Sequence, residues 1–204
     1  MDGKREDIIL DNIRSRRSVR DFQDRMIPDD VVNKIIEAGR FAPSALNRQP
    51  WQFIVIQDRK TIRELSGIIF LRIKSLYPFF PLLGFFKKSL RDEKFLSAMK
   101  KTVESDPEAV FYKAPLVVAV ANDTRFDDTR MDCSFAAQNM MLAASSYGIG
   151  SCFIGRGKVI PKRLLQKRFG LPAYYDFNVW VVFGYPRDAQ RTAPPRREDT
   201  VRKI

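Results

Sequence analysis

The chain of 204 residues is 45% hydrophobic, which suits a single domain with a sizeable core, and its formal net charge is +12. It contains no histidine, which excludes Ser-His and Cys-His nucleophile pairs, histidine-ligated metal sites and an imidazole base. The two cysteines, Cys133 and Cys152, lack metal-ligand spacing, so we expect reduced thiols in a reducing compartment and no disulfide framework.

The N-terminal segment is charged and then amphipathic. No apolar core segment follows residues 1–7, so we expect no signal peptide and a cytoplasmic protein. Isoleucines at helical spacing predict a short helix over residues 5–15, which is followed by the run Arg16-Arg17-Ser18-Val19-Arg20. Its three guanidinium groups and its hydroxyl could bind a phosphate or neutralise charge on a ring, although a solvated basic turn has the same composition.

A stiff polar loop connects the next helix to a strand. Proline and acidic residues at 27–30 indicate a helix start, and the apolar, β-branched run at 51–56 is typical of a strand, after which residues 59–66 look helical. The loop contains two prolines and three small polar residues, Pro43, Ser44, Asn47, Gln49 and Pro50. A backbone restricted in this way could hold a planar ligand, and an ordinary proline-rich connection is the alternative.

Residues 67–113 differ from the rest because aromatic residues and leucines crowd among prolines and lysines. We expect a lid with helical parts that covers a pocket, a partner subunit or a membrane surface, although core packing explains most of these aromatics equally well. The most apolar window, residues 68–86, contains two charged residues and two prolines and is therefore a poor transmembrane helix. Contact of this window with a membrane surface is an alternative that the sequence alone does not favour.

Two buried elements and a glycine cluster follow. The continuous apolar run at 114–121 predicts a strand covered on both faces. The helix predicted at 129–147 is apolar nearly all round, which requires burial on every side and indicates a subunit interface as well as a core. Gly148 can end this helix, and the glycines up to Gly155 let backbone N–H groups approach a ligand. The spacing is not G-x-G-x-x-G and does not precede a helix, which excludes a Rossmann fingerprint.

The last quarter of the chain is strongly basic. Residues 161–169 predict a short basic helix and residues 176–185 a further strand. From residue 156 to the C-terminus there are twelve basic and four acidic residues, which suggests an anionic partner such as a phosphate-bearing cofactor, nucleic acid or an anionic membrane. The extension at 194–198 is rich in proline and arginine and lacks its own periodicity, so we expect it to pack against a partner subunit.

Four motifs in this order resemble the nitroreductase family of FMN-dependent oxidoreductases. They are R-R-S-x-R at 16–20, A-P-S-x-x-N-x-Q-P-W at 42–51, G-I-G-S-C-F-I-G at 148–155, and F-G-Y-P at 183–186 before a terminal arginine. The resemblance implies an α+β, three-layer fold with a central mixed sheet flanked by helices, in one domain over residues 1–204 with a variable aromatic lid at 67–113. It also implies an intertwined homodimer with two FMN sites at its interface.

The resemblance carries the family's cofactor-binding residues onto four parts of this chain. The N-terminal FMN-binding motif is matched by Arg16, Ser18 and Arg20, with Arg17 as a neighbour and with Arg20 at the flavin N1/O2 edge. The loop that reaches the flavin bound mainly by the other subunit is matched by Pro43, Ser44, Ala45 and Asn47. The backbone near flavin N5 is matched by Ile154 and Gly155, and the phosphate-binding arginine by Arg196 or, with less support, Arg197.

These expectations describe an enzyme in which NADH or NADPH gives a hydride to flavin N5, and a nitroaromatic, a quinone or another small acceptor is then reduced at the same face. No protein acid or base is obligatory, so we predict no catalytic side chain and no metal, which agrees with the absence of histidine. The same fold also hosts dehalogenation, enoate reduction and flavin fragmentation. A basic protein that binds nucleic acid by stacking bases on aromatics is a further alternative, but it gives no reason for the loop at Pro43.

Overall fold

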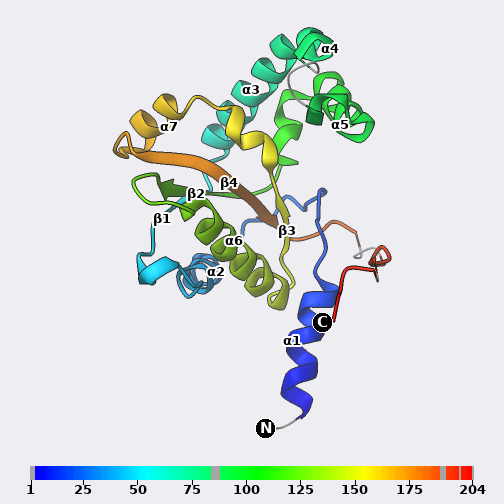
Figure 1. Ribbon diagram of the computed structural model, residues 1–204, viewed down its shortest axis with the longest axis vertical. Coiled ribbons are helices and arrows are strands. Elements are labelled where there is room, and N and C mark those ends of the chain that lie inside the picture. Colours follow the sequence, from blue (N-terminus) through cyan, green and yellow to red (C-terminus); the bar gives the residue numbers. More distant parts are fainter. Residues whose placement is uncertain (1–2, 84–87, 189–191, 198, 204) are drawn as a thin grey trace.

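The computed structural model describes residues 3–83, 88–188, 192–197 and 199–203, and Figure 1 labels its helices and strands. At its centre is a sheet made of β1 (Trp51–Ile56), β2 (Leu116–Asp123), β3 (Gly150–Phe153) and β4 (Tyr175–Gly184). The strand order is β1-β2-β4-β3, and the three ladders between these strands are antiparallel. The prediction of a mixed sheet is therefore wrong for the described strands, and Ser18 and Ser151 form only an isolated parallel bridge at the β3 edge, outside the named strands.

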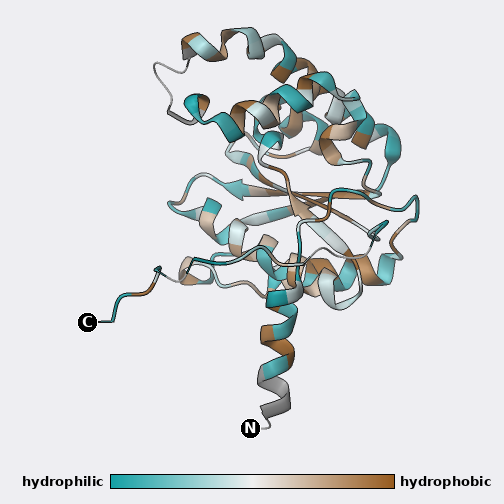
Figure 2. Ribbon diagram, turned by 90° about the vertical axis from the view of Figure 1, so that its right-hand side faces the viewer, coloured by the Kyte–Doolittle hydropathy of each residue, from teal (hydrophilic) through white to brown (hydrophobic). Residues whose placement is uncertain are grey.

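Helices cover both faces of the sheet, which confirms the expected α+β, three-layer arrangement (Figure 2). The helices on one face are α2 (Asp29–Arg40) and α6 (Thr129–Ser146). Those on the other face are α3 (Arg59–Leu76), α5 (Glu93–Glu104) and α7 (Lys162–Phe169). Because side chains alternate along a strand, Val181 and Phe183 of β4 pack with the first pair, whereas Trp180 and Val182 pack with the second group.

The elements around the sheet lie close to where the sequence pattern predicts them. Strand β1 covers the predicted residues 51–56, and β2 is buried along its whole length, as its continuous apolar run requires. Helix α2 begins directly after Pro28, with Asp29 and Asp30 in its first turn, where carboxylates stabilise the positive end of the helix dipole. Local sequence preference and tertiary packing therefore agree over most of the sheet and its inner helices.

Helix α6 packs small residues such as Ala136 and the side chain of Met140 into the core between the sheet and α2. On its other side Met131 and Phe135 are 53% and 50% exposed. The prediction that this helix is buried on every side therefore does not hold within one chain. Gly148, with a φ of +68°, follows the helix end in the left-handed conformation expected of it. The glycine-rich segment after it forms β3, which the sequence analysis does not predict.

Residues 67–113 are largely helical. Helix α3 runs on to Leu76, and the elements after it are η2 (Tyr77–Phe79), α4 (Phe80–Leu83), η3 (Lys88–Arg91), α5 and η4 (Pro107–Phe111). Core packing accounts for three of the aromatics in this region, because Phe70, Phe80 and Phe111 are buried. Two further aromatics of the predicted lid, Phe85 and Phe86, lie outside the described residues.

Helix α1 (Gly3–Ser15) projects from the body of the protein, at the opposite end of the long axis from α4 (Figure 1). Its C-terminal half is tied to α6, where Asn12 Nδ2 donates a hydrogen bond of 3.1 Å to the Leu142 carbonyl. The chain then turns along the β3 edge, where Ser18 forms a bridge with Ser151, and Phe22 forms a second bridge with Pro186, which follows β4. The segments that follow α1 and β4 therefore lie near one edge of the sheet.

Candidate active site

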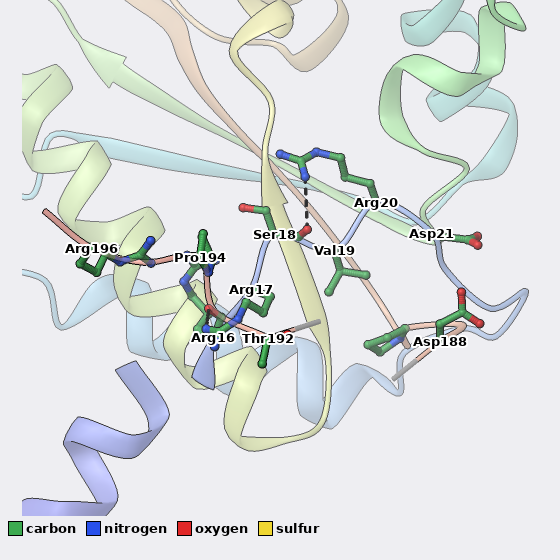
Figure 3. A pocket seen from close by; sticks show the side chains of 11 residues that line it. Arg16, Arg17, Ser18, Val19, Arg20, Asp21, Asp188, Thr192, Pro194 and Arg196 are labelled. Carbon is green, nitrogen blue, oxygen red and sulfur yellow. Dashed lines mark hydrogen bonds between the residues drawn. The ribbon is translucent and has the colours of Figure 1, made fainter. Parts of the chain in front are cut away.

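A cavity of about 700 Å³ opens beside the β3 edge, between the segment after α1 and the C-terminal extension (Figure 3). Its lining comes from both ends of the chain and consists of residues 16–21, Pro186, Asp188, Thr192, Pro194 and Arg196. A volume of this size suits a small-molecule ligand. The cavity therefore brings together five of the residues predicted from sequence, Arg16, Arg17, Ser18, Arg20 and Arg196.

Backbone pairing with β3 holds the N-terminal wall of the cavity in place. The Val19 N–H donates a 3.0 Å hydrogen bond to the Ser151 carbonyl, next to the parallel bridge between Ser18 and Ser151. Gly150 is needed at this point, because a Cβ there would lie 2.5 Å from Cγ2 of Val19. One glycine of the predicted ligand-approach cluster thus serves the packing of two chain segments, and the spacing alone could not show this.

Charge is unevenly distributed in the cavity. In Figure 3, Arg16, Arg17 and Arg196 lie toward one end, and Asp21 and Asp188 lie toward the other. Guanidinium groups match a phosphate in both charge and hydrogen-bonding geometry, because each presents several N–H donors in a planar fork. The arginine end of the cavity is therefore suited to an anionic group of a ligand. The middle of the cavity could hold a neutral part of that ligand.

The structure distinguishes the two neighbouring arginines of the C-terminal extension. Arg196 lines the cavity. Arg197 instead donates two hydrogen bonds, of 2.9 and 2.6 Å, to the carboxylate of Asp199. This ion pair lowers the pKa of Asp199 below its ordinary value, since the bound guanidinium favours the charged carboxylate. The geometry thus favours Arg196 over Arg197 as the arginine that binds a ligand in the cavity.

Two side chains of β3 beside this wall carry potential chemistry. Ser151 Oγ is buried and finds no hydrogen-bond partner among the described residues, an arrangement that costs free energy until some atom bonds to it. Burial raises the pKa of the Cys152 thiol, although the nearby Arg20 guanidinium and the Ser18 hydroxyl act in the opposite direction. At neutral pH Cys152 is therefore a protonated thiol and not a nucleophile.

The segment at the end of β3 passes from the core to the surface. Ile154 is buried and its N–H donates to the Trp180 carbonyl at 2.8 Å, whereas Gly155 is exposed and begins η5 (Gly155–Val159). Neither residue is among the described residues that line the cavity. Phe153, which the sequence analysis does not single out, is 48% exposed, and its ring lies 3.7 Å from the position of a Cβ on Gly155. An aromatic on the outer side of a short edge strand is the signal that could have identified it.

The loop predicted to bind a ligand does not line the cavity of its own chain. It contains η1 (Ala45–Asn47), and it is fixed internally by a 3.0 Å hydrogen bond from the Gln49 N–H to Ser44 Oγ. Leu46, Asn47 and Gln49 all have positive φ, between 49° and 54°, which non-glycine residues rarely adopt. The Leu46 side chain is 83% exposed. The loop that follows Pro43 is thus held in a specific, outward-facing shape within its own chain.

Arg156 is a further residue that the sequence analysis misses. Its guanidinium donates to the Thr102 hydroxyl of α5 and, at 2.9 Å, to the Tyr112 hydroxyl, so it ties η5 to the helical region over residues 67–113. Thr102 lies in the last turn of α5, where a cation also interacts favourably with the helix dipole. The position of Arg156 directly after Ile154 and Gly155 was the sequence signal that could have pointed to it. Its hydrogen-bond partners, however, lie more than 40 residues away along the chain.

Comparisons with known proteins match most of this chain to one family. A model of the nitroreductase family matches residues 13–185, which is most of the chain. A protein of Archaeoglobus fulgidus, provisionally named as an NADH dehydrogenase/NAD(P)H nitroreductase, is 31% identical over 183 residues, covering 88% of this chain and 86% of its own. The matched range begins before the arginine segment and ends at the last residues of β4.

Solved structures share the fold over nearly the whole chain. A Bacteroides fragilis nitroreductase with bound FMN is 29% identical and superposes with a TM-score of 0.75, covering 96% of this chain and 98% of its own. An iodotyrosine deiodinase bound to FMN and 3-iodo-L-tyrosine has a TM-score of 0.71 with the same two coverages, at 23% identity. At that identity the second likeness concerns the fold alone.

Proposed function

This chain belongs to the nitroreductase family, and from this premise we propose that it is an FMN-dependent oxidoreductase that uses NADH or NADPH to reduce a small organic acceptor, such as a nitroaromatic or a quinone. The observation that carries the proposal is the convergence of the Arg16–Arg20 segment and Arg196 on one cavity. These residues were selected from sequence motifs at opposite ends of the chain, and the fold brings them together.

The residues present in the cavity fit FMN, which combines an anionic phosphate with a planar, hydrogen-bonding ring. The arginine end offers the positive charge, and the hydroxyl of Ser18 offers a neutral polar contact. When bound, FMN accepts and donates the hydride, so the chain needs no acid, base or nucleophile of its own. This agrees with the absence of histidine and with the protonated state of Cys152.

The roles of individual residues follow from their chemistry. Arg16 and Arg196 would bind the phosphate, because both line the arginine end of the cavity. Arg20 would place a positive charge at the N1/O2 edge of the ring, which stabilises the negative charge added on reduction. The backbone at Ile154 and Gly155 would orient the reactive edge, and Phe153 would pack against the ring and exclude water.

A second copy of the chain would complete this site. Helix α1 exposes Ile8, Ile9, Leu10 and Ile13, and Figure 2 shows apolar and hydrophilic residues alternating along it. Apolar side chains on a projecting helix are stabilised when another surface covers them. In a homodimer each loop at Pro43 would reach the cavity of the other chain, which accounts for its preformed, outward-facing shape. We expect this enzyme to work in the reducing cytoplasm, since both of its cysteines are free and buried.

The proposal is tested by the absorption spectrum of the purified protein and by anaerobic stopped-flow reduction. We expect one FMN per chain to remain bound through gel filtration, and its absorbance to bleach with NADH or NADPH. A colourless protein that does not retain added FMN would overturn the proposal. Retained FMN that neither nucleotide reduces would leave the cofactor in place and would overturn the choice of donor.

The acceptor is a separate question, because one fold hosts several flavin reactions, as the iodotyrosine deiodinase neighbour illustrates. Reoxidation of the reduced enzyme by nitroaromatics, quinones and halogenated phenols should be compared under one set of conditions. We expect kcat/KM to be highest for a nitroaromatic or a quinone. A preference of more than tenfold for a halogenated phenol would instead favour a dehalogenating enzyme on the same fold.

A further inference from the structure

The end of the molecule farthest from α1 exposes a group of large apolar side chains. Here α3 passes into η2 and α4 (Figure 1), and the exposed residues are Leu71 (64%), Leu76 (42%), Phe79 (57%) and Leu82 (62%). We refer to these four residues as the apolar tip. Their neighbours Phe70, Ile73 and Phe80 point inward and are buried, so the segment has one side in the core and the other in water.

The sequence that forms the apolar tip carries charge of one sign. From Leu65 to Arg91 the sequence contains five lysines and arginines and no aspartate or glutamate. Two of these cations, Arg72 and Lys74, lie on α3 next to the tip and are exposed. The nearest acidic residues in sequence are Glu64, more than a helical turn before the tip, and Asp92, which caps α5. A partner that meets the exposed side of this segment is therefore favoured if it offers apolar contact and negative charge together.

Composition also separates α3 from an ordinary core helix. Residues Arg59–Leu82 are long and apolar enough to cross a membrane, yet only 33% of their most apolar window is buried within the protein. The buried side of α3 is held in the core by residues such as Leu65 and Ile69, so the helix cannot leave the body to span a bilayer. Exposed apolar residues bordered by cations are instead typical of a segment that lies in the interface of an anionic membrane.

We propose that the apolar tip docks onto the surface of an anionic lipid bilayer. Leu71, Phe79 and Leu82 enter the boundary between head groups and acyl chains, and Arg72 and Lys74 contact the lipid phosphates. Charge complementarity favours this partner over a second copy of the chain, because a second tip would bring like charges together on a protein with a net charge of +12. The tip also lies at the opposite end from α1, the surface assigned above to the dimer.

Flotation of the FMN-loaded, full-length protein with vesicles tests this proposal. We expect binding to vesicles of mixed phosphatidylglycerol and phosphatidylcholine at low salt, and at least tenfold weaker binding to phosphatidylcholine alone. The triple variant Leu71→Gln, Phe79→Gln, Leu82→Gln should lower binding about tenfold or more, since it removes three inserted apolar groups. The double variant Arg72→Gln, Lys74→Gln should lower binding to anionic vesicles by roughly tenfold and should reduce its salt dependence.

Controls separate docking from unfolding and from self-association. Leu164→Gln, at an exposed leucine of α7 outside the tip, should bind vesicles as the unchanged protein does. In Phe79→Trp, the emission that the introduced tryptophan adds to that of Trp51 and Trp180, obtained as the difference from the unchanged protein, should shift to the blue only when anionic vesicles are added. Equal vesicle binding by the unchanged protein and the triple variant would overturn the proposal. The proposal would also be overturned if, without lipid, the emission of the introduced indole were already blue-shifted and protected from acrylamide. A second copy of the chain would then cover the tip.

Discussion

The two ends of the long axis both expose apolar side chains, yet their charges differ. At one end, α1 exposes four residues, Ile8, Ile9, Leu10 and Ile13, within a helix that carries three basic and three acidic residues. At the other end, the apolar tip exposes four residues in a segment with five basic residues and no acidic ones. Apolar exposure is therefore common to both ends, and the distribution of charge is what distinguishes them.

The comparison teaches that exposed apolar area indicates a binding surface, and that the surrounding charge indicates the kind of partner. A neutral mixture of charges allows α1 to meet an identical surface without net repulsion, which a symmetric homodimer requires. A segment with cations and no anions of its own opposes such self-pairing and favours an anionic partner. The candidate active site lies nearer the first end, beside the β3 edge, so disturbance of the two ends should have separable consequences.

The largest effect is expected from charges placed on α1. Ile9→Asp combined with Ile13→Asp puts two carboxylates on one face of the helix, where the dimer would bury them without partners. We expect dimerisation to weaken about 100-fold or more, with loss of FMN and of activity, as measured by light scattering after gel filtration and by the bound flavin absorbance.

Both isoleucines are exposed in the single chain, so the variant should keep the far-ultraviolet circular dichroism of the unchanged protein. The matched change at the other end, Leu71→Asp, should leave dimerisation unaffected. A dimer that survives the α1 variant would contradict the assignment of the two ends. A dimer lost on the Leu71 change would reverse it.

The next effect concerns the cofactor and compares two adjacent arginines. Arg196→Gln removes a cation from the cavity wall and should weaken FMN binding about tenfold or more, the magnitude expected for a charge-assisted phosphate contact. Arg197→Gln is the matched control, since that side chain is already bonded to Asp199 outside the cavity. Fluorescence titration of the apoprotein with FMN measures both. Equal losses from the two variants would contradict the distinction drawn from the geometry.

The sequence predicts the parts of this molecule whose structure is decided locally. The apolar, β-branched run of β1, the continuous apolar run of β2 and the proline at the start of α2 each specify an element, and these elements are present where expected. The motif residues Arg16, Ser18 and Arg20 line the cavity, but their composition alone also suits a solvated basic turn, and only their order with three other motifs pointed to a site.

What the sequence does not predict depends on long-range contacts. Gly150 is a glycine because Val19 packs against it, and Arg156 is placed by the hydroxyls of Thr102 and Tyr112, so neither role shows in local spacing. The charge bias near the tip is visible in sequence, but the exposure of its leucines is not, because the same pattern would suit a core helix. Only the packing of α3 separates its inner from its outer face.

A smaller effect is expected where the helical region meets the active site. Arg156→Gln removes the charged group that holds α5 against η5, and should raise KM for the acceptor roughly threefold to tenfold while FMN affinity stays unchanged. Arg156→Lys should restore part of the difference, because it keeps the charge and one donor. Steady-state kinetics with a saturating donor measure both, and Arg163→Gln on α7 serves as the control. A fall in FMN affinity instead of a rise in KM would show that Arg156 supports the cofactor and does not couple the two regions.

The smallest effect on the comparison should come from the sheet that lies between the two ends. Asp123, at the end of β2, is buried and accepts hydrogen bonds from Arg125, which lowers the pKa of this carboxylate. Asp123→Asn should therefore destabilise the protein at pH 7 by about 1 kcal/mol, without changing dimerisation or vesicle binding.

The effect of this variant should depend on pH, because the pKa of the Asp123 carboxylate is lower in the folded state than its value near 3.8 in the unfolded state. The carboxylate therefore stabilises the folded state at pH values above its unfolded pKa, and this contribution disappears as the pH falls through its folded pKa. Denaturant titrations should thus show the difference between the variant and the unchanged protein shrinking below about pH 4, whereas the exposed control Asp127→Asn should show little difference at any pH. If Asp123→Asn also altered dimerisation or vesicle binding, the two ends would be coupled through the sheet and would not be independent surfaces.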